Sequence, residues 1–240
     1  MREFFKGFSL ALSMLSTLPF FRVHNFTPGI NGFAVLSYPL VGLILGSILY
    51  GVALLLAPFV AATHLGIILF SLWVLLTGAL HLDGFCDSVD GLYVPKERAL
   101  EVMKDPHNGG MGMIFRAVFL LLKASSVAHL EALYLLPVLL MLSRLMALLA
   151  IYFFPYVGGG MGRLAKEELK GWQVMVALFY TALVVFLTDS WILFGGSIAL
   201  LLLIKYFFVK RLGGFTGDIY GFTIEVIELL LLNLIIVGLV

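Results

Sequence analysis

Charge is what this sequence has least of. Only 12% of its 240 residues are Asp, Glu, Lys or Arg, whereas 62% are hydrophobic. Soluble domains carry about 25% charged residues, so this chain cannot build a water-soluble surface. The net charge of +1 leaves no basic face for phosphates, which argues against a nucleic-acid-binding protein. The single cysteine, Cys86, excludes an intramolecular disulfide and a zinc site built on a cysteine pair.

Apolar segments account for most of the chain. A helix that spans a bilayer needs about 20 apolar residues. Seven segments approach this length, near 33–56, 65–80, 113–128, 132–154, 172–187, 191–208 and 222–240. Residues 1–21 lack a small-residue cleavage site and contain Pro19, so we expect them to be retained as an interfacial or re-entrant helix. We therefore predict an all-α integral membrane protein. It is a polytopic helical bundle of about seven transmembrane helices plus that N-terminal helix, with residues 1–240 forming one membrane-embedded catalytic domain.

The basic residues indicate how the chain is threaded through the membrane. Segments 57–64, 129–131 and 188–190 contain no Lys or Arg. Twelve of the 15 basic residues lie at or beside the opposite side, namely Arg2, Lys6, Arg22, Lys96, Arg98, Lys104, Arg163, Lys166, Lys170, Lys205, Lys210 and Arg211. By the positive-inside rule that side is cytoplasmic. We expect a multi-pass protein of the inner (cell) membrane, with a cytoplasmic N-terminus and an external C-terminus.

The acidic residues are concentrated on the same side. Six of the 14 lie in one polar stretch, namely Asp83, Asp87, Asp90, Glu97, Glu101 and Asp105. Asp83, Asp87 and Asp90 stand at i, i+4 and i+7, so on a helix they share one face and repel one another unless a cation lies among them. Oxygen ligands favour Mg²⁺ or Mn²⁺ over zinc. The alternative is a solvated acidic loop, but the position directly after an apolar run favours a metal site at the mouth of a span.

Groups suited to anions surround this stretch. Lys104 and Asp105 begin a turn that contains Gly109 and Gly112 and leads into the third span. Backbone N–H groups in such a turn, with a helix N-terminus behind them, suit an anionic oxygen, although glycines also simply mark loops. Within the spans lie Arg116, Lys123 and Arg144. Arg116 is near a helix end and can snorkel, whereas Lys123 and Arg144 lie deeper and require an anion or a carboxylate partner.

A second polar group lies near the C-terminus. Thr216 and Asp218 precede the last span, and Glu225 and Glu228 lie inside it. At helical spacing the three acids fall within one sector. Carboxylates within an apolar span favour a functional role, and the alternative is structural pairing with Lys123 or Arg144. We expect the last span to pack beside the second and third, so that both acidic groups line one cleft.

These residues together resemble the cobalamin synthases, the adenosylcobinamide-GDP ribazoletransferases. The similarity covers nearly the whole chain and includes residues 15–19, 37–42 (SYPLVG), 81–92 (HLDGFCDSVDGL), 103–112, 121–123 (LLK) and 212–218 (LGGFTGD), followed by Glu225 and Glu228. Two positions depart from the family pattern. Cys86 replaces a small residue, and His107 stands where the family has arginine, which weakens a phosphate contact at that position.

The resemblance implies a Mg²⁺-dependent phosphotransferase of vitamin B12 synthesis. Adenosylcobinamide-GDP and α-ribazole, or its 5′-phosphate, are joined to give adenosylcobalamin, or its 5′-phosphate, and GMP. Such chemistry needs a metal clamp and cationic groups for a pyrophosphate. The expected metal ligands are Asp83, Asp87 and Asp90. The expected catalytic residues are Asp83, Asp87, Asp218, Glu225 and Glu228, with the base left open. The expected substrate-binding residues are His81, Lys104, Asp105, Gly109, Gly112, Lys123, Arg144 and Thr216.

Two other classes remain as alternatives. A CDP-alcohol phosphotransferase also uses aspartates and Mg²⁺ at a membrane surface, but residues 92–95 after Asp90 and Gly91 lack the Ala-Arg that its pattern requires. A secondary transporter would place ionisable residues near the bilayer midplane and often show repeated halves. This chain has its largest acidic group at one mouth and shows no repeat.

Overall fold

The computed structural model describes residues 2–19, 21, 27–105, 107 and 109–239. Arg22 and parts of the glycine-rich turn lie outside these residues. The described residues form twelve α-helices and contain no β-strand. The helices are α1 (Arg2–Leu15), α2 (Ile30–Leu36), α3 (Tyr38–Leu56), α4 (Ala62–Thr77), α5 (Leu80–Leu92), α6 (Lys96–Val102), α7 (Gly110–Ala128), α8 (Leu136–Phe153), α9 (Met161–Glu168), α10 (Gly171–Leu187), α11 (Trp191–Leu212) and α12 (Gly217–Ile236).

Helix length and hydropathy confirm the polytopic membrane fold. Five helical segments of the described chain are long and apolar enough to cross a membrane alone: α3, α7, α8 with its preceding turn, α11 and α12. The pairs α4–α5 and α9–α10 pass the same test together, so the chain has up to seven spans if each bent pair counts as one. Helix α1 has 14 residues, or about 21 Å, which is shorter than the ~30 Å hydrocarbon core.

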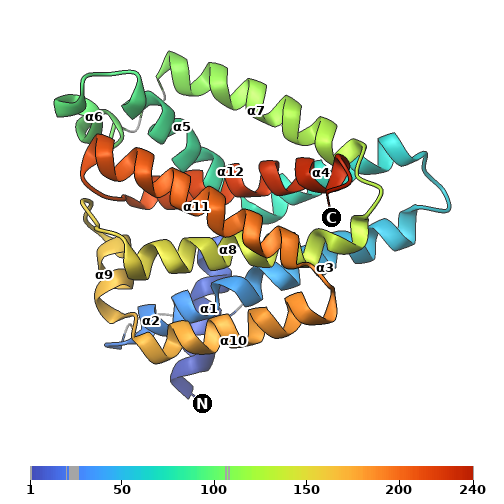
Figure 1. The fold of residues 1–240 in the computed structure, drawn as a ribbon, viewed down its shortest axis with the longest axis horizontal. Coiled ribbons are helices and arrows are strands. Elements are labelled where there is room, and N and C mark those ends of the chain that lie inside the picture. The colour runs from blue at the N-terminus through green and yellow to red at the C-terminus, as the bar shows by residue number, and fades with distance from the viewer. Residues whose placement is uncertain (1, 20, 22–26, 106, 108, 240) are drawn as a thin grey trace.

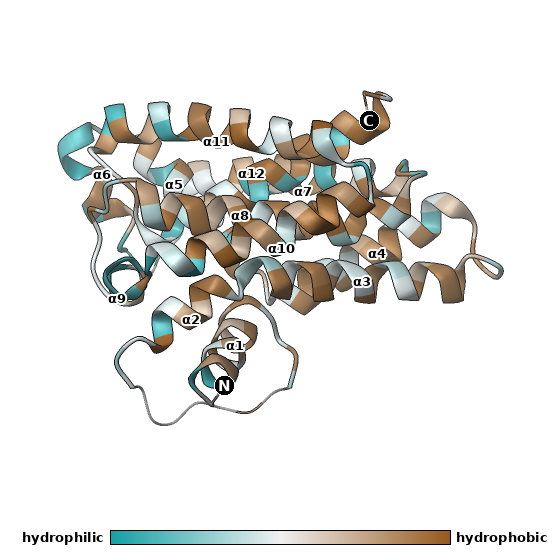
Figure 2. Cartoon of the chain, turned by 60° about the horizontal axis from the view of Figure 1, so that its bottom comes forward, coloured by the Kyte–Doolittle hydropathy of each residue, from teal (hydrophilic) through white to brown (hydrophobic). Residues whose placement is uncertain are grey.

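The long helices lie side by side with their connections at two opposite ends (Figure 1). The α3–α4, α7–α8 and α10–α11 connections lie at the right of the picture. At the left lie α5, α6, α9 and the α11–α12 turn, which we call the polar end. Figure 2 shows hydrophilic residues gathered at α6 and α9, and brown, hydrophobic residues along the long helices between the two ends. The connections that lack Lys and Arg and the basic connections thus lie at opposite ends of the bundle.

The second predicted span is broken. Helix α4 ends at Thr77, and α5 begins at Leu80 after a bend of 84°. Gly78 and Ala79 take left-handed backbone conformations, with φ of 61° and 57°, which end one helix and redirect the next. The sequence suggested that the aspartates directly continue this span. In the structure they lie on a separate helix instead. The Thr17 backbone N–H donates to the Leu76 carbonyl at 2.8 Å, so the N-terminal segment satisfies a backbone group near the break.

Helix α8 is the centre of the bundle. In its most apolar 18-residue stretch, 89% of the residues are buried inside the protein, against 28% in the corresponding stretches of α7 and α11. Glycines of α3 allow that helix to approach α8 at backbone contact, since a Cβ at Gly46 would lie 2.5 Å from the Leu136 carbonyl oxygen. Small residues at such crossings are typical of membrane helices. The enclosed position of α8 means that a charge on it can be compensated only by neighbouring helices.

Candidate active site

Helices α5 and α12 cross at very short range, and this crossing builds the site. A Cβ at Gly84 would lie 2.8 Å from the Asp218 carbonyl oxygen, and one at Gly221 would lie 3.1 Å from the His81 carbonyl oxygen. Two glycines at the crossing therefore permit the backbones to touch. Because of this contact, residues more than 100 positions apart in the sequence lie side by side. The last span was predicted to pack beside the second and third; α12 does pack against α5, the second half of the bent α4–α5 pair, and against α7.

Three carboxylates gather at this crossing, and we call Asp83, Asp87 and Asp218 the mouth cluster. The negative charges of Asp83 and Asp218 both act on the Asp87 carboxylate. A nearby cation is Arg116 on α7, whose Nη2 lies 3.4 Å from Asp83 Oδ1. The side chain of Asp83 is 61% exposed, so this ion pair is a weak one. Three acids beside one cation leave an excess of negative charge at the mouth.

A pocket of about 270 Å³ opens beside the mouth cluster. Asp83 and Asp218 line it, together with His81, Tyr38 and Tyr220. Its other walls are mainly apolar and come from α1, α8, α9 and α12. One acid of each stretch, Asp83 or Asp218, thus lines the cavity, whereas Asp87, Asp90, Glu225 and Glu228 do not, so the predicted single cleft is confirmed for these two residues only.

Thr216 fixes the start of α12. Its hydroxyl accepts a hydrogen bond from the Ile219 N–H at 3.4 Å, which is the N-cap geometry, and it lies 3.2 Å from Asp218 Oδ2 as a donor. Thr216 was predicted to bind substrate. In the structure it caps α12 and holds the Asp218 carboxylate, and its contact with substrate stays a prediction.

Asp90 differs from the other two aspartates of its helix in its hydrogen-bond partners. Its Oδ2 accepts from the Gly109 N–H and its Oδ1 from the Gly112 N–H, each at 2.8 Å. The helix N-terminus of α7, predicted to bind a substrate anion through Gly109 and Gly112, holds the carboxylate of Asp90 instead. A Cβ at either glycine would collide with that carboxylate. Among the described residues, no group of three His, Cys, Asp or Glu side chains is arranged to hold a metal ion.

Lys104 and Asp105 lie beyond α6 at the polar end, and both are exposed. Asp105 Oδ1 accepts from the His107 N–H at 2.9 Å and lies 2.9 Å from His107 Nδ1. These hydrogen bonds lower the pKa of the Asp105 carboxyl, so it stays ionised to a more acidic pH than a free aspartate. His107, which stands where the family has arginine, therefore contacts Asp105.

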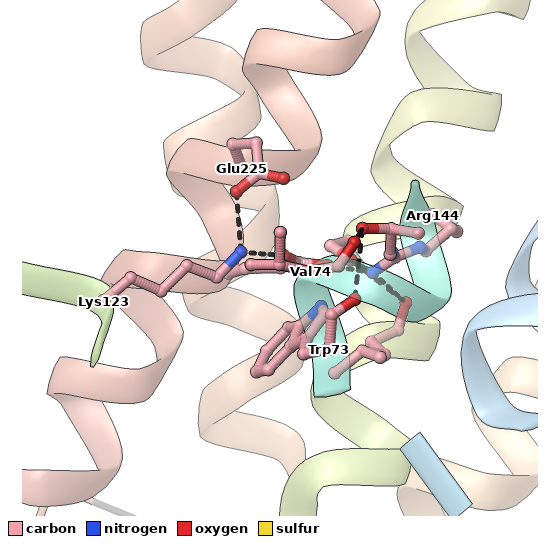
Figure 3. Close-up of polar contacts among 9 residues, drawn as sticks. Trp73, Val74, Lys123, Arg144 and Glu225 are labelled. Carbon is pink, nitrogen blue, oxygen red and sulfur yellow. Dashed lines mark hydrogen bonds and ion pairs between the residues drawn. The ribbon is translucent and has the colours of Figure 1, made fainter. Parts of the chain in front are cut away.

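The deepest charges pair with one another, and we call Lys123, Arg144, Glu225 and Glu228 the interior cluster. Lys123 Nζ lies 2.6 Å from Glu225 Oε2 and 2.5 Å from Glu228 Oε2, and Arg144 pairs with Glu228 Oε1. All four side chains are at most 4% exposed. Figure 3 shows Lys123 reaching toward Glu225, with Trp73 nearby and Arg144 on the other side of the group. Lys123 Nζ also lies 4.5 Å from the centre of the Trp73 ring.

The interior cluster is the pairing that the sequence left open as an alternative for these residues. Two cations and two anions balance there, and they join α7, α8 and α12. Lys123, Arg144, Glu225 and Glu228 were predicted as substrate-binding or catalytic residues. The structure places them against one another and away from the lining of the pocket.

Comparison with known proteins identifies the family. The family model described as cobalamin-5-phosphate synthase matches residues 7–236, which include the mouth cluster, the pocket and the interior cluster. The chain belongs to this family. A relative from Desulfitobacterium hafniense, named adenosylcobinamide-GDP ribazoletransferase, is 37% identical over 93% of each chain. A relative with the same name from Thermosynechococcus vestitus is 39% identical over 83% of this chain and 84% of its own length. Another, from Acinetobacter baumannii, is 35% identical over 96% of this chain and 97% of its own length. No solved structure is significantly similar to the chain.

Several residues of this family member's pocket were not predicted from its sequence. Tyr38, Tyr220 and Met161 line it from α3, α12 and α9. Arg116 reaches Asp83 and does not merely snorkel. A lone tyrosine or methionine in an apolar helix carries no signal of its own. The glycines that face each other across the α5–α12 crossing were the available signal, since closely packed small residues mark where membrane helices meet.

Proposed function

We propose that this chain is an adenosylcobinamide-GDP ribazoletransferase. The observation that carries the proposal is the convergence of two family stretches, residues 81–92 and 212–218, on one pocket at the polar end. Relatives named for this activity match over most of the chain. The reaction joins adenosylcobinamide-GDP and α-ribazole, or its 5′-phosphate, and releases GMP.

The bond changes define what the site must do. A ribose hydroxyl oxygen of the acceptor attacks the phosphorus that bears the cobinamide. The bond from that phosphorus to the GMP oxygen breaks, and GMP leaves with the electron pair. The hydroxyl proton passes to a carboxylate. Asp218 lines the pocket and is held by Thr216, so we assign proton acceptance to Asp218.

The mouth cluster suits a divalent cation shared with the substrate. Its donors are all carboxylate oxygens, and Asp83 and Asp218 face the same open space. Mg²⁺ is typically held by one or two carboxylates plus phosphate oxygens of the substrate, so the protein need not supply three ligands. We assign Asp83 and Asp87 to Mg²⁺, and Asp90 to its bonds with the α7 N-terminus. When bound, the ion would neutralise the pyrophosphate, and Arg116 at the same mouth would contact its remaining oxygens.

The polar end is the cytoplasmic end in this proposal. The basic connections supply the argument through the positive-inside rule. Reporters placed after Lys96 or Lys166 should then read cytoplasmic, and reporters at Thr63 or at the C-terminus should read external. A cytoplasmic reading at the C-terminus would overturn this orientation in the inner membrane.

The decisive experiment is an assay of the purified protein. Incubation with adenosylcobinamide-GDP, α-ribazole and Mg²⁺ should release GMP, with none released when either substrate is omitted. EDTA should stop the reaction and Mg²⁺ should restore it. Ca²⁺ should substitute poorly, because its coordination is larger and looser. Release of CMP from a CDP-alcohol, without GMP release from adenosylcobinamide-GDP, would overturn the assignment. Full activity in EDTA would overturn the metal site alone.

A further inference from the structure

Two buried polar side chains in the pocket have no partner within the described chain. Both ring nitrogens of His81 and the hydroxyl of Tyr220 lack a hydrogen-bond partner. The side chains are only 4% and 7% exposed, and both line the pocket. Leaving such groups unpaired is costly, so a pocket that contains them is suited to a ligand that supplies the missing bonds.

The Tyr220 ring is held firmly in place. It stacks on Tyr156 with ring centres 5.9 Å apart, and it contacts Phe215 at 5.8 Å. His81 lies at the α5–α12 crossing, where Gly221 approaches its backbone. The two unpartnered groups therefore have fixed positions, and a neutral imidazole together with a phenol offers both donors and acceptors.

The remaining walls select an apolar ligand. Met14, Leu15 and Ile151 line the pocket from α1 and α8, and the carboxylates of Asp83 and Asp218 line it from α5 and α12. The ligand that matches this order is a nucleoside with a largely apolar, flat base. The base lies among the apolar walls with its ring nitrogen near the polar pair, and the sugar hydroxyls lie at the carboxylates.

The donor substrate does not match this pocket. Guanine has several donors and acceptors along its edges, and the interior offers few buried polar side chains to pair with them. A volume of about 270 Å³ is at the lower limit for a drug-sized ligand, so a corrin ring cannot enter. The donor must therefore reach the mouth from outside the pocket.

We propose that this pocket is the binding subsite for the base of the acceptor nucleoside, with His81 and Tyr220 as its hydrogen-bond partners. The inference rests on the proposed function and adds to it by assigning one of the two substrates to a specific cavity. It also explains the geometry of attack. An acceptor bound in the pocket presents its ribose to Asp218, while the donor pyrophosphate lies on the outer side of the mouth cluster.

Binding of α-ribazole to the purified protein, without adenosylcobinamide-GDP, tests the subsite. Tyr220→Phe removes only the hydroxyl and should weaken binding about threefold to tenfold, the loss of one neutral hydrogen bond. His81→Phe should weaken it at least as much. In turnover, KM for α-ribazole should rise while KM for adenosylcobinamide-GDP stays unchanged. Tyr134→Phe, at the opposite end of the bundle and 58% exposed, is the matched control. Unchanged α-ribazole binding in both pocket variants, or an equal rise in both KM values, would overturn the proposal.

Cysteine protection gives a second measurement that does not depend on those variants. Met161→Cys in a Cys86→Ala background places a 40% exposed position at the pocket wall. α-Ribazole should slow its reaction with a maleimide, whereas GMP should not. Met175→Cys, on a 66% exposed surface of α10, should react equally with and without either compound. Protection by GMP and not by α-ribazole would assign the pocket to the donor. In that case, GMP release by the wild-type protein in the presence of both substrates would still support the proposed function, and only the assignment of the pocket would be wrong.

Discussion

Helix α12 carries two kinds of carboxylate that differ in how their charge is compensated. Glu225 and Glu228 belong to the interior cluster, where two cations balance two anions out of contact with water. Asp218 belongs to the mouth cluster, where three acids lie beside one half-buried cation, Arg116. Unpaired buried charge is too expensive to keep without a function. We propose that the balanced group has a structural role and that a bound cation compensates the excess negative charge at the mouth.

The largest effect that separates the two clusters is on stability. Lys123→Met removes one cation from the interior cluster and leaves an uncompensated buried carboxylate, which should cost about 3–5 kcal/mol of unfolding free energy. The double variant Lys123→Met/Glu225→Gln restores the balance of one cation and one anion. It should recover at least half of that loss, as measured by denaturant unfolding in detergent.

The same variants decide whether the interior cluster has a catalytic role. In the double variant, GMP release per folded molecule should stay within about threefold of wild type. If Lys123 binds substrate phosphate instead, turnover will fall by about 10²-fold or more in protein that is still folded. A double variant less stable than the sum of the two single variants would contradict the proposed pairing.

Neutralising an acid of the mouth cluster should lower turnover and leave stability unchanged, the opposite of what is expected for the interior cluster. Asp87→Asn and Asp218→Asn should each reduce turnover by about 10²- to 10³-fold, because they remove a group that acts on the pyrophosphate or the attacking hydroxyl. Stability should be unchanged or slightly higher, since each substitution relieves repulsion among the three acids. GMP release and thermal unfolding of the same samples provide the measurement. Activity within threefold of wild type in both variants would remove the mouth cluster from the mechanism.

The sequence predicted the coarse organisation because the bilayer imposes it. Apolar length and the alternation of basic connections are properties of single segments, so the helical bundle and the shared location of residues 81–92 and 212–218 could be inferred without contacts. The partners of individual charges could not. Whether Glu225 meets Lys123 or a substrate depends on how α7 and α12 are rotated against each other, and this rotation is set by packing over the whole bundle.

Asp90 shows why helical spacing alone was insufficient. Its i+7 position places it on the face of Asp83, but about two turns further along α5. There it accepts hydrogen bonds from the N-terminus of α7. The break at Gly78 and Ala79 was also missed, because an alanine with a positive φ has no sequence signature. Both differences arise from contacts between segments, which periodicity within one segment does not contain.

The close crossing of α5 and α12 can be tested by adding one methyl group. Gly84→Ala places a Cβ within 2.8 Å of the Asp218 carbonyl oxygen, so the helices must separate. We expect a loss of about 1–3 kcal/mol in unfolding free energy, together with reduced turnover, because Asp83 and Asp218 move apart. Gly195→Ala, in α11, meets nothing within 4 Å and serves as the control, with stability unchanged or slightly higher. Equal behaviour of the two variants would mean that the crossing does not position the site.

The smallest effect is expected at Asp90. Its position in the sequence groups it with Asp83 and Asp87 of the mouth cluster, but its carboxylate has partners within the protein, as those of the interior cluster do. Asp90→Asn keeps the shape of the side chain but replaces one acceptor oxygen with an NH₂ group, so one of the two glycine N–H groups loses its partner. The expected cost is about 1–2 kcal/mol of unfolding free energy, since the other hydrogen bond survives without its charge. Turnover should fall by less than about tenfold, because the α7 N-terminus that carries Arg116 toward the mouth loosens without losing a reacting group. A Mg²⁺ titration of GMP release separates the two roles. If Asp90 only holds α7, the Mg²⁺ concentration for half-maximal rate stays that of wild type, whereas a metal ligand would raise it and lower turnover by about 10²-fold.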